Sequence, residues 1–249
     1  EGVAERMLVP LFIERDFTTL NSRYLSFLDI GGSHAHRLKP LVKKLRIPTV
    51  IITDVDPVEE IVGKPTKDGK PTTTLAAVAN TGQAGLQCGN PTLRGWHPKL
   101  QQLEDFKNPT EVQLVWKEVA ECLVRFAWQL PVAEAGNHWP STFADSLVLK
   151  NIPWFRGLLD EKVDGEGNKI KPPKGALGFV ARRVADHEDI SDLLAALHKL
   201  MHGSFKKGDF AASIFEMVAA DEPIACPKYI ADALEWLQTQ LDPNPEFKP

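Results

Sequence analysis

Two aspartates, Asp54 and Asp56, follow the apolar run at residues 48–53 and are separated by one residue. Like charges this close repel each other unless a positive group lies between them. A single intervening residue in an extended chain points both carboxylates to the same side. Such a pair can bind Mg²⁺, which takes oxygen ligands in proteins. The alternative is that an aspartate caps the turn favoured by the following Pro57.

Glu1 and Glu5 form a second pair of carboxylates, with Gly2 between them. Residues four apart share one face of a helix, so both carboxylates would point the same way. The glycine permits a tight entry from a strand into that helix. Many pairs with this spacing lie on a solvated helix face, so the spacing alone leaves that alternative open.

The pattern of apolar residues predicts the elements that position these four carboxylates. We expect helices at residues 3–15 and 35–45 and strands at 24–32 and 48–54. Alternation of helix and strand at these lengths indicates βαβ units and an α/β fold. In such folds ligands bind outside the carboxyl ends of the parallel strands, where "TDVD" lies. We also expect a strand directly before Glu1 in a longer protein, of which this sequence would be a fragment.

The remainder of the sequence is predicted to be mainly helical. The Gly-, Pro-, Thr- and Asn-rich residues 62–99 predict a loop with a short strand near 74–78. A long amphipathic helix is expected at 110–130, begun by Thr110 and ended by Pro131. Further helices are expected at 141–151, 189–203, 208–221 and 227–241, with a polar loop at 161–175 and a frayed tail at 242–249.

The composition is that of a globular protein, with 43% hydrophobic and 25% charged residues. The net charge of −4 is not that of a non-specific nucleic-acid coat, although a local basic patch could still contact DNA. The three cysteines are far apart and form no CxxC motif, which favours reduced thiols, a cytoplasmic location and no structural zinc. No apolar stretch is long enough to cross a membrane, so we expect no membrane association.

Four segments together resemble a known family. "EGVAE", followed some fifty residues later by "TDVD", resembles the Toprim domain of topoisomerases, primases and certain nucleases. The stretch "FLDIGGSHAHRLKPLVKKLRIPTVIITDVD" resembles the OLD (overcoming lysogenization defect) nucleases, class 2 in particular. "STFADSLVLKN" and "KKGDFAASIFE" are similar to two later segments of that family. The resemblance covers residues 1–60, 137–151 and 200–216, and implies a Rossmann-like parallel sheet flanked by helices, with an associated or inserted helical domain.

The resemblance also implies a domain arrangement. A Toprim core would occupy residues 1–104, and a mainly helical domain 105–200 would include the Toprim-like segment near 137–151. Residues 201–249 would return to the Toprim site and add C-terminal helices. The family further implies an N-terminal ATPase domain that binds ATP and forms a homodimer. No Walker A motif occurs in this sequence, so we expect no ATP hydrolysis by this segment itself.

The activity implied by the resemblance is metal-dependent cleavage of DNA by an endonuclease. Two Mg²⁺ ions, or Mn²⁺ in their place, would clamp the scissile phosphate. The residues that match metal ligands of the family are Glu1, Glu5, Asp54, Asp56 and Asp145. The residues assigned a catalytic role are Glu1 as base or ligand, Asp54 as the ligand closest to both ions, and Lys207. The residues assigned to DNA phosphate are Ser33, Lys206 and Lys207.

Three of these assignments have structural alternatives. Asp145 could be a first-turn acid favoured by the helix dipole. Ser33 could cap the helix at 35–45, and Lys207 could be a solvated lysine before a helix. We prefer Lys207 to Lys206 because Lys207 directly precedes Gly208.

Ala144 departs from the family pattern, which leads us to expect a glutamate there. The departure keeps open a catalytically impaired DNA-binding or regulatory module as an alternative function. Another Toprim enzyme, such as a primase or a topoisomerase, is a second alternative. A topoisomerase needs a nucleophilic tyrosine, and neither Tyr24 nor Tyr229 has a suggestive context. The family implies roles in DNA repair, replication or phage defence, and some members are encoded beside a superfamily 1 helicase.

Overall fold

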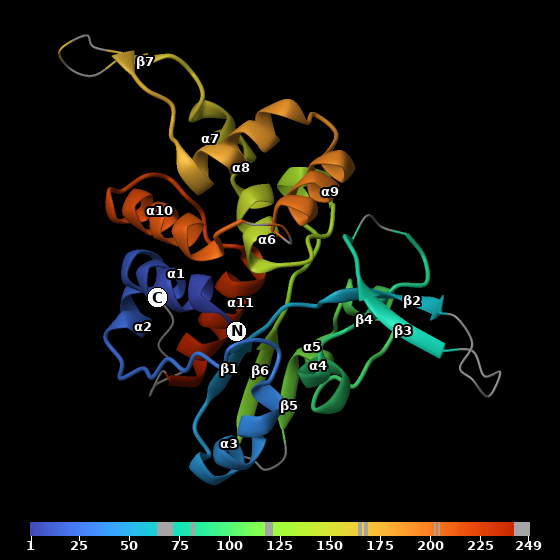
Figure 1. The fold of residues 1–249 in the computed structure, drawn as a ribbon. Helices are drawn as coiled ribbons and strands as arrows, with labels where there is room; N and C mark the ends of the chain where they lie inside the picture. Colours follow the sequence, from blue (N-terminus) through green and yellow to red (C-terminus); the bar gives the residue numbers. More distant parts are fainter. Residues whose placement is uncertain are drawn as a thin grey trace.

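A three-stranded sheet lies at the centre of the protein, in a computed structural model that describes residues 1–63, 72–80, 83–117, 122–163, 166, 169–201, 203 and 205–241 (Figure 1). Its strand order is β1–β6–β5. Strand β1 (Thr49–Ile52) pairs in parallel with β6 (Leu123–Ala127), and β5 (Val115–Lys117) pairs antiparallel with β6. The parallel pair therefore joins segments that lie more than seventy residues apart in the sequence.

Both faces of this sheet are covered. Ile51 and Phe126 are buried in one apolar cluster, with Trp96 and Trp128. The neighbouring Ile52 packs against a second, larger cluster on the opposite face. A strand that is buried on both sides has a continuous apolar sequence rather than an alternating one. This explains why "TVII" and "LVRFA" are mainly apolar; the exception in β6 is Arg125, which pairs with Glu111 at 3.0 Å.

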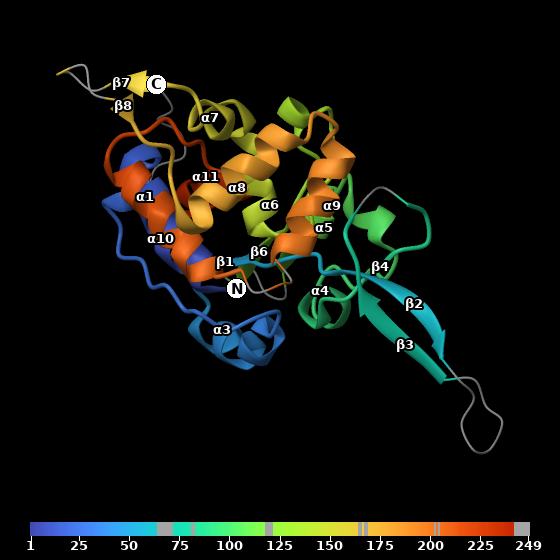
Figure 2. The same ribbon diagram turned by 45° about the horizontal axis from the view of Figure 1, so that its top comes forward.

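The larger cluster is built mainly from helices. Helix α11 (Lys228–Leu241) packs against β1 and β6, and α10 (Lys207–Ala219) lies along α1 (Val3–Asp16), as the views of Figures 1 and 2 agree. The other helices of this side are α2 (Thr18–Asn21), α6 (Phe143–Lys150), α7 (Ile152–Gly157), α8 (Gly175–Asp186) and α9 (Ile190–Met201).

Shorter elements surround the other face of the sheet. They are the 3-10 helix η1 (Ala35–Leu38), α3 (Lys39–Leu45), α4 (Pro91–Gly95), η2 (Leu103–Phe106) and α5 (Glu111–Leu114). The 3-10 helix η3 (Ala133–Ala135) instead contacts α6 and buries Ala135 in the larger cluster. A second, antiparallel sheet is formed by β2 (Pro57–Gly63), β3 (Thr72–Ala77) and β4 (Gln87–Cys88), and its β2–β3 ribbon projects from the body of the molecule (Figure 2). A small hairpin pairs β7 (Lys162–Val163) with β8 (Lys169–Ile170).

The α/β class predicted from the sequence is confirmed. Strand β1 and helix α1 form where they were expected, and the segment 35–45 is helical as η1 followed by α3. The predicted helices at 141–151, 189–203, 208–221 and 227–241 correspond to α6, α9, α10 and α11. Strand β3 matches the short strand predicted near 74–78. The predicted domain boundaries stay a prediction, although the central sheet joins strands from both sides of residue 104.

The long helix predicted at 110–130 is wrong. Helix α5 occupies only its first turn, and the chain then enters strands β5 and β6, with residues 118–121 outside the described part. The run "CLVRFAW" is apolar apart from Arg125 because β6 is a central strand with apolar clusters on both sides. An apolar run that is buried all round cannot be assigned to helix or strand by periodicity alone. Its pairing partner β1 decides the outcome.

The strand predicted at 24–32 is also wrong. The segment is not paired with any described strand, and Tyr24 and Leu28 are 96% and 67% exposed. An extended segment becomes a strand only when a neighbouring strand satisfies its backbone groups. Two further regions differ from expectation: residues 62–99 contain more strand than predicted, in β2 to β4, and α8 was not predicted. The polar loop at 161–175 contains the β7–β8 hairpin, and the tail 242–249 lies outside the described residues.

Among the described helices, none combines the length and the apolar character that crossing a membrane requires.

Candidate metal centre

Three carboxylates meet at the carboxyl end of β1. Glu1, Asp54 and Asp56 each offer an oxygen, and these oxygens all lie within 4.8 Å of one another. Asp54 and Asp56 belong to the segment that follows β1, and Asp56 has a positive φ of 47°. A non-glycine residue with this backbone conformation is uncommon and is often found at functional sites. The predicted aspartate pair is thus placed beside the first glutamate of the sequence.

Glu1 is held against the end of β1 by its backbone and its side chain. Its backbone nitrogen donates to the carbonyl of Ile52 at 3.2 Å. Its Oε2 accepts from the backbone N–H of Asp54 at 2.9 Å and from the hydroxyl of Thr53. Gly32, with a φ of +109° that favours glycine, donates its N–H to the carbonyl of Glu1 at 2.9 Å. The Glu1 carboxylate is therefore fixed relative to Asp54.

Asp54 is oriented by two donors from distant segments. The backbone N–H of Phe143, the first residue of α6, donates to Oδ1 of Asp54 at 3.1 Å. The side-chain amide of Gln129 donates to the same oxygen. Gln129 was not predicted as a site residue. Its sequence signal is a polar residue within a largely apolar run, just after β6.

A second unpredicted pair, Gly89 and Asn90, fixes the backbone that carries the aspartates. Asn90 is fully buried, and its amide nitrogen donates to the carbonyl of Asp54 at 2.6 Å. Its side-chain oxygen caps α4 by accepting the N–H of Thr92 at 2.9 Å. Gly89 donates to the carbonyl of Asp56 at 2.7 Å, and a Cβ at Gly89 would lie 2.7 Å from that oxygen. Only glycine permits this close approach.

Glu5 lies in the first turn of α1, where it accepts from the N–H of Gly2 at 3.2 Å. It is 8% exposed, and burial raises the pKa of its carboxyl, with a further contribution from the charge of Glu1. The charge of Glu5 in turn raises the pKa of Asp54. The structure therefore brings the predicted glutamate pair close enough to the aspartates to act on them electrostatically.

The aspartates are difficult to ionise together. Burial, followed by the charges of Glu5, Glu1 and Asp56, raises the pKa of Asp54 well above its usual value. Burial and the charge of Glu1 raise the pKa of Asp56 to about 6. Carboxylates crowded in this way stay ionised when a cation lies among them. The donor set of several carboxylate oxygens fits a hard divalent cation.

Asp145 is buried in the first turn of α6, two residues after Phe143, whose N–H binds Asp54. It is 2% exposed, and its Oδ1 has no hydrogen-bond partner among the described residues. Burial raises its pKa to about 6, opposed by a hydrogen bond from Thr142 and by the charge of Lys207. An unsatisfied buried carboxylate oxygen is costly, and a bound cation would satisfy it. The neighbouring Ala144 packs its methyl group against the larger apolar cluster.

The predicted basic and hydroxyl residues are placed differently from one another. Lys207 is exposed at the start of α10, and its charge lowers the pKa values of both Asp56 and Asp145. The Nζ of Lys206 instead lies 3.9 Å from Asp209 on its own helix. The side chain of Ser33 hydrogen-bonds to Asp56 and lowers its pKa. The charge of Lys207 and the side chain of Ser33 thus act on these carboxyl groups, whereas Lys206 is paired with Asp209.

Three helix starts contribute groups to this region. Helix α1 carries Glu5 in its first turn, α6 begins with Phe143, whose N–H binds Asp54, and α10 begins with Lys207. The start of a helix bears a partial positive charge that favours anions. These helix ends therefore offset part of the carboxylate charge and would also favour a phosphate group.

A known family matches the part of the chain that carries the acidic cluster. Residues 1–56 match the family model described as "Overcoming lysogenization defect protein-like, TOPRIM domain". Residues 1–56 are therefore similar to the Toprim domain of this family.

A relative matches the chain over most of its length. It is "Endonuclease GajA" of Bacillus cereus (strain HuB5-5), which is 24% identical over 245 residues, or 97% of this chain. The chain spans 31% of the length of that relative. No solved structure matches the chain.

Proposed function

We propose that this chain is the catalytic segment of a metal-dependent DNA endonuclease that hydrolyses phosphodiester bonds. The observation that carries the proposal is the meeting of Glu1, Asp54 and Asp56, whose oxygens lie within 4.8 Å of one another. The Toprim match and the similarity to a protein named as an endonuclease support the same activity. DNA is the proposed substrate.

The proposed ligands of two Mg²⁺ ions, or of Mn²⁺, are the carboxylates of the cluster and its neighbours: Glu1, Glu5, Asp54, Asp56 and Asp145. When bound, such a pair of ions activates a water molecule and stabilises charge on the leaving 3′ oxygen. Asp54 is the proposed shared ligand because Glu1, Glu5 and Asp56 all raise its pKa.

The chain's own residues have separate proposed roles. Glu1 accepts the proton of the attacking water or serves as a ligand, and its orientation is fixed by Thr53 and the backbone of Asp54. Lys207 stabilises the charge that develops on the phosphate in the transition state. Ser33 and Lys206 contact DNA phosphate groups, Ser33 from within the site and Lys206 from its rim.

The proposal for the whole protein goes beyond this chain. An ATPase domain that binds ATP would precede this segment and form the homodimer, and a superfamily 1 helicase would be a partner. The protein would act in the cytoplasm, in DNA repair, replication or phage defence.

A second candidate function is a metal-binding module with impaired catalysis. Ala144 favours it, because a methyl group packed against the apolar cluster occupies the position next to the N–H that binds Asp54. Such a module would bind metal and DNA without cleaving the backbone.

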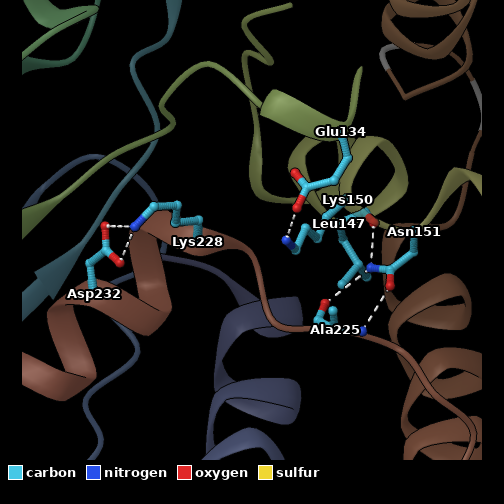
Figure 3. A network of polar contacts seen from close by, with 7 residues as sticks. All are labelled: Glu134, Leu147, Lys150, Asn151, Ala225, Lys228 and Asp232. Atoms are coloured by element: carbon cyan, nitrogen blue, oxygen red, sulfur yellow. Dashed lines mark hydrogen bonds and ion pairs between the residues drawn. The ribbon is translucent and has the colours of Figure 1, made fainter. Parts of the chain in front are cut away.

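The experiment that tests the proposal is cleavage of supercoiled plasmid with Mg²⁺, Mn²⁺ or EDTA. Asp54→Ala should abolish the cleavage. The matched control is Asp232→Ala, because Asp232 is not among the proposed ligands and pairs with Lys228 at 2.6 Å on α11 (Figure 3). Metal-dependent nicking or linearisation that is lost only in Asp54→Ala would support the nuclease. Cleavage that survives in Asp54→Ala would refute the assigned site, and metal binding without cleavage would favour the impaired module.

A further inference from the structure

Gln129 lies beside Asp54, just after β6, the strand that pairs in parallel with β1. Its side chain is fully buried, and it follows β6 just as Asp54 follows β1. The amide nitrogen donates to Oδ1 of Asp54, and the amide oxygen accepts the backbone N–H of Val55 at 2.9 Å. One side chain therefore contacts both the carboxylate of Asp54 and the backbone directly after it.

The orientation of this amide is fixed by chemistry. A backbone N–H can only donate, so the oxygen of the Gln129 amide must face Val55. The nitrogen then faces Oδ1 of Asp54, and when a bound cation keeps that carboxylate ionised the oxygen can only accept. A flipped amide would place oxygen against oxygen at Asp54 and nitrogen against nitrogen at Val55.

The surroundings of Gln129 hold it in place from two further sides. Its amide nitrogen also donates to the hydroxyl of Tyr229 on α11 at 3.3 Å. Its backbone carbonyl accepts from the indole nitrogen of Trp139 at 2.8 Å. Tyr229 and Trp139 are themselves buried, so the glutamine cannot turn away without breaking contacts in the core.

Both donors to Asp54 use the same carboxylate oxygen. The N–H of Phe143 and the amide of Gln129 converge on Oδ1, which leaves Oδ2 uncommitted to either donor. Two fixed donors on one oxygen hold that oxygen in place and so restrict how the carboxylate can turn. Residues that orient a metal ligand in this way tune metal affinity as the ligands themselves do.

We propose that Gln129 is a positioning residue that holds the Asp54 carboxylate in the orientation required for divalent-metal binding. The inference rests on the proposed function, because it assigns Gln129 to the same metal site. It predicts that Gln129 sets metal affinity as well as stability.

The test is calorimetric titration of the protein with Mn²⁺ alone. Gln129→Met keeps the size of the side chain and removes all three of its hydrogen bonds. Gln129→Asn keeps an amide but lacks one methylene, so it cannot reach Asp54 and Val55 together. We expect the Kd for Mn²⁺ to rise about 10- to 100-fold in both variants, as is typical when a residue that orients a ligand is lost.

Asn151→Leu is the matched control for a purely structural role. The Asn151 side chain is buried and also makes three hydrogen bonds, to the carbonyls of Leu147 and Ala225 and from the N–H of Ala225, at 2.7–3.0 Å (Figure 3). Its loss should lower the thermal midpoint to a similar extent as Gln129→Met. Mn²⁺ affinity should stay at the wild-type value, because these contacts lie outside the acidic cluster.

Each outcome of the titration is informative. Weaker Mn²⁺ binding in the Gln129 variants, with unchanged binding in folded Asn151→Leu, supports the inference. Wild-type affinity in a folded Gln129 variant, together with loss of binding in Asp54→Ala, overturns the role of Gln129 and leaves the metal site intact. Failure of the wild-type protein to bind Mn²⁺, or unchanged binding in Asp54→Ala, overturns the proposed function and this inference with it.

Discussion

The backbone N–H of Phe143 donates to Oδ1 of Asp54 at 3.1 Å, across 89 positions of the sequence. This bond sets the start of α6 against the residue that follows β1. It brings together two segments that resemble the same family although they lie far apart in the sequence. The residue next to Phe143 is Ala144, where the family resemblance leads us to expect a glutamate.

Ala144→Glu should strengthen the site. A carboxylate next to the N–H that binds Asp54 would add an oxygen ligand to a cluster built from such ligands. We expect about a tenfold or greater rise in plasmid nicking rate and a lower Kd for Mn²⁺. Ala144→Gln, of the same size without the charge, is the control. Unchanged nicking in Ala144→Glu would show that this position has another role.

Lys207→Ala should slow cleavage much more than Lys206→Ala. Lys207 acts on Asp56 and Asp145 through its charge, whereas Lys206 lies 3.9 Å from Asp209. Loss of a group that stabilises transition-state charge costs about 10²–10³ in rate. Single-turnover cleavage with saturating metal would measure the effect. Equal losses in the two variants would contradict the assignment, and Lys207→Arg should retain more activity than Lys207→Ala.

Gly89→Ala should disturb the backbone that carries the aspartates. The added Cβ would lie 2.7 Å from the carbonyl oxygen of Asp56 and 2.8 Å from a methyl carbon of Val58, so something must shift. Overpacking of this kind costs about 1–3 kcal/mol of unfolding free energy. Chemical denaturation would measure the loss, and Mn²⁺ titration should show weaker binding. Gly95→Ala is the control, because a Cβ there meets no atom within 4 Å.

The metal-free protein should lose stability as the pH rises from about 4 to 7. The pKa values of Asp56 and Asp145 are raised from 3.8 to about 6, chiefly by burial. The folded state therefore binds more protons than the unfolded state between these values, and its stability falls until the pH has passed the folded pKa. A protein of this size loses about 2–4 °C in thermal midpoint for each kcal/mol.

Thermal melts in EDTA between pH 4 and 8 would test this pH dependence. Mg²⁺ should raise the midpoint more at pH 7.5 than at pH 5, because the cation binds the ionised carboxylates. The double variant Asp56→Asn, Asp145→Asn should flatten the metal-free profile. A metal-free midpoint that instead rises steadily from pH 4 to 7 would contradict the burial of these acids.

The sequence could predict the parts of the site that lie close together in the chain. The apolar run before Asp54 and the spacing of Asp54 and Asp56 were enough to predict β1 and a pair of carboxylates at its end. The apolar pattern of residues 3–15 was enough to predict α1, which carries Glu5 in its first turn, whereas Glu1 lies before the helix rather than on a shared helix face. These features depend on local backbone geometry, which a single segment determines.

Only the tertiary structure decided the rest. The segment at 123–127 became a strand because β1 supplied its backbone partners and two apolar clusters covered its faces. That pairing, which no local periodicity encodes, placed Gln129 beside Asp54. The charge of Lys207 acts on Asp145 only because of where α10 packs. Hydrophobic packing is non-directional, so the apolar face of α10 does not reveal which helix it will pack against. The sequence alone was therefore enough to predict which carboxylates occur and how they are spaced. Contacts between distant segments determined how those carboxylates are oriented.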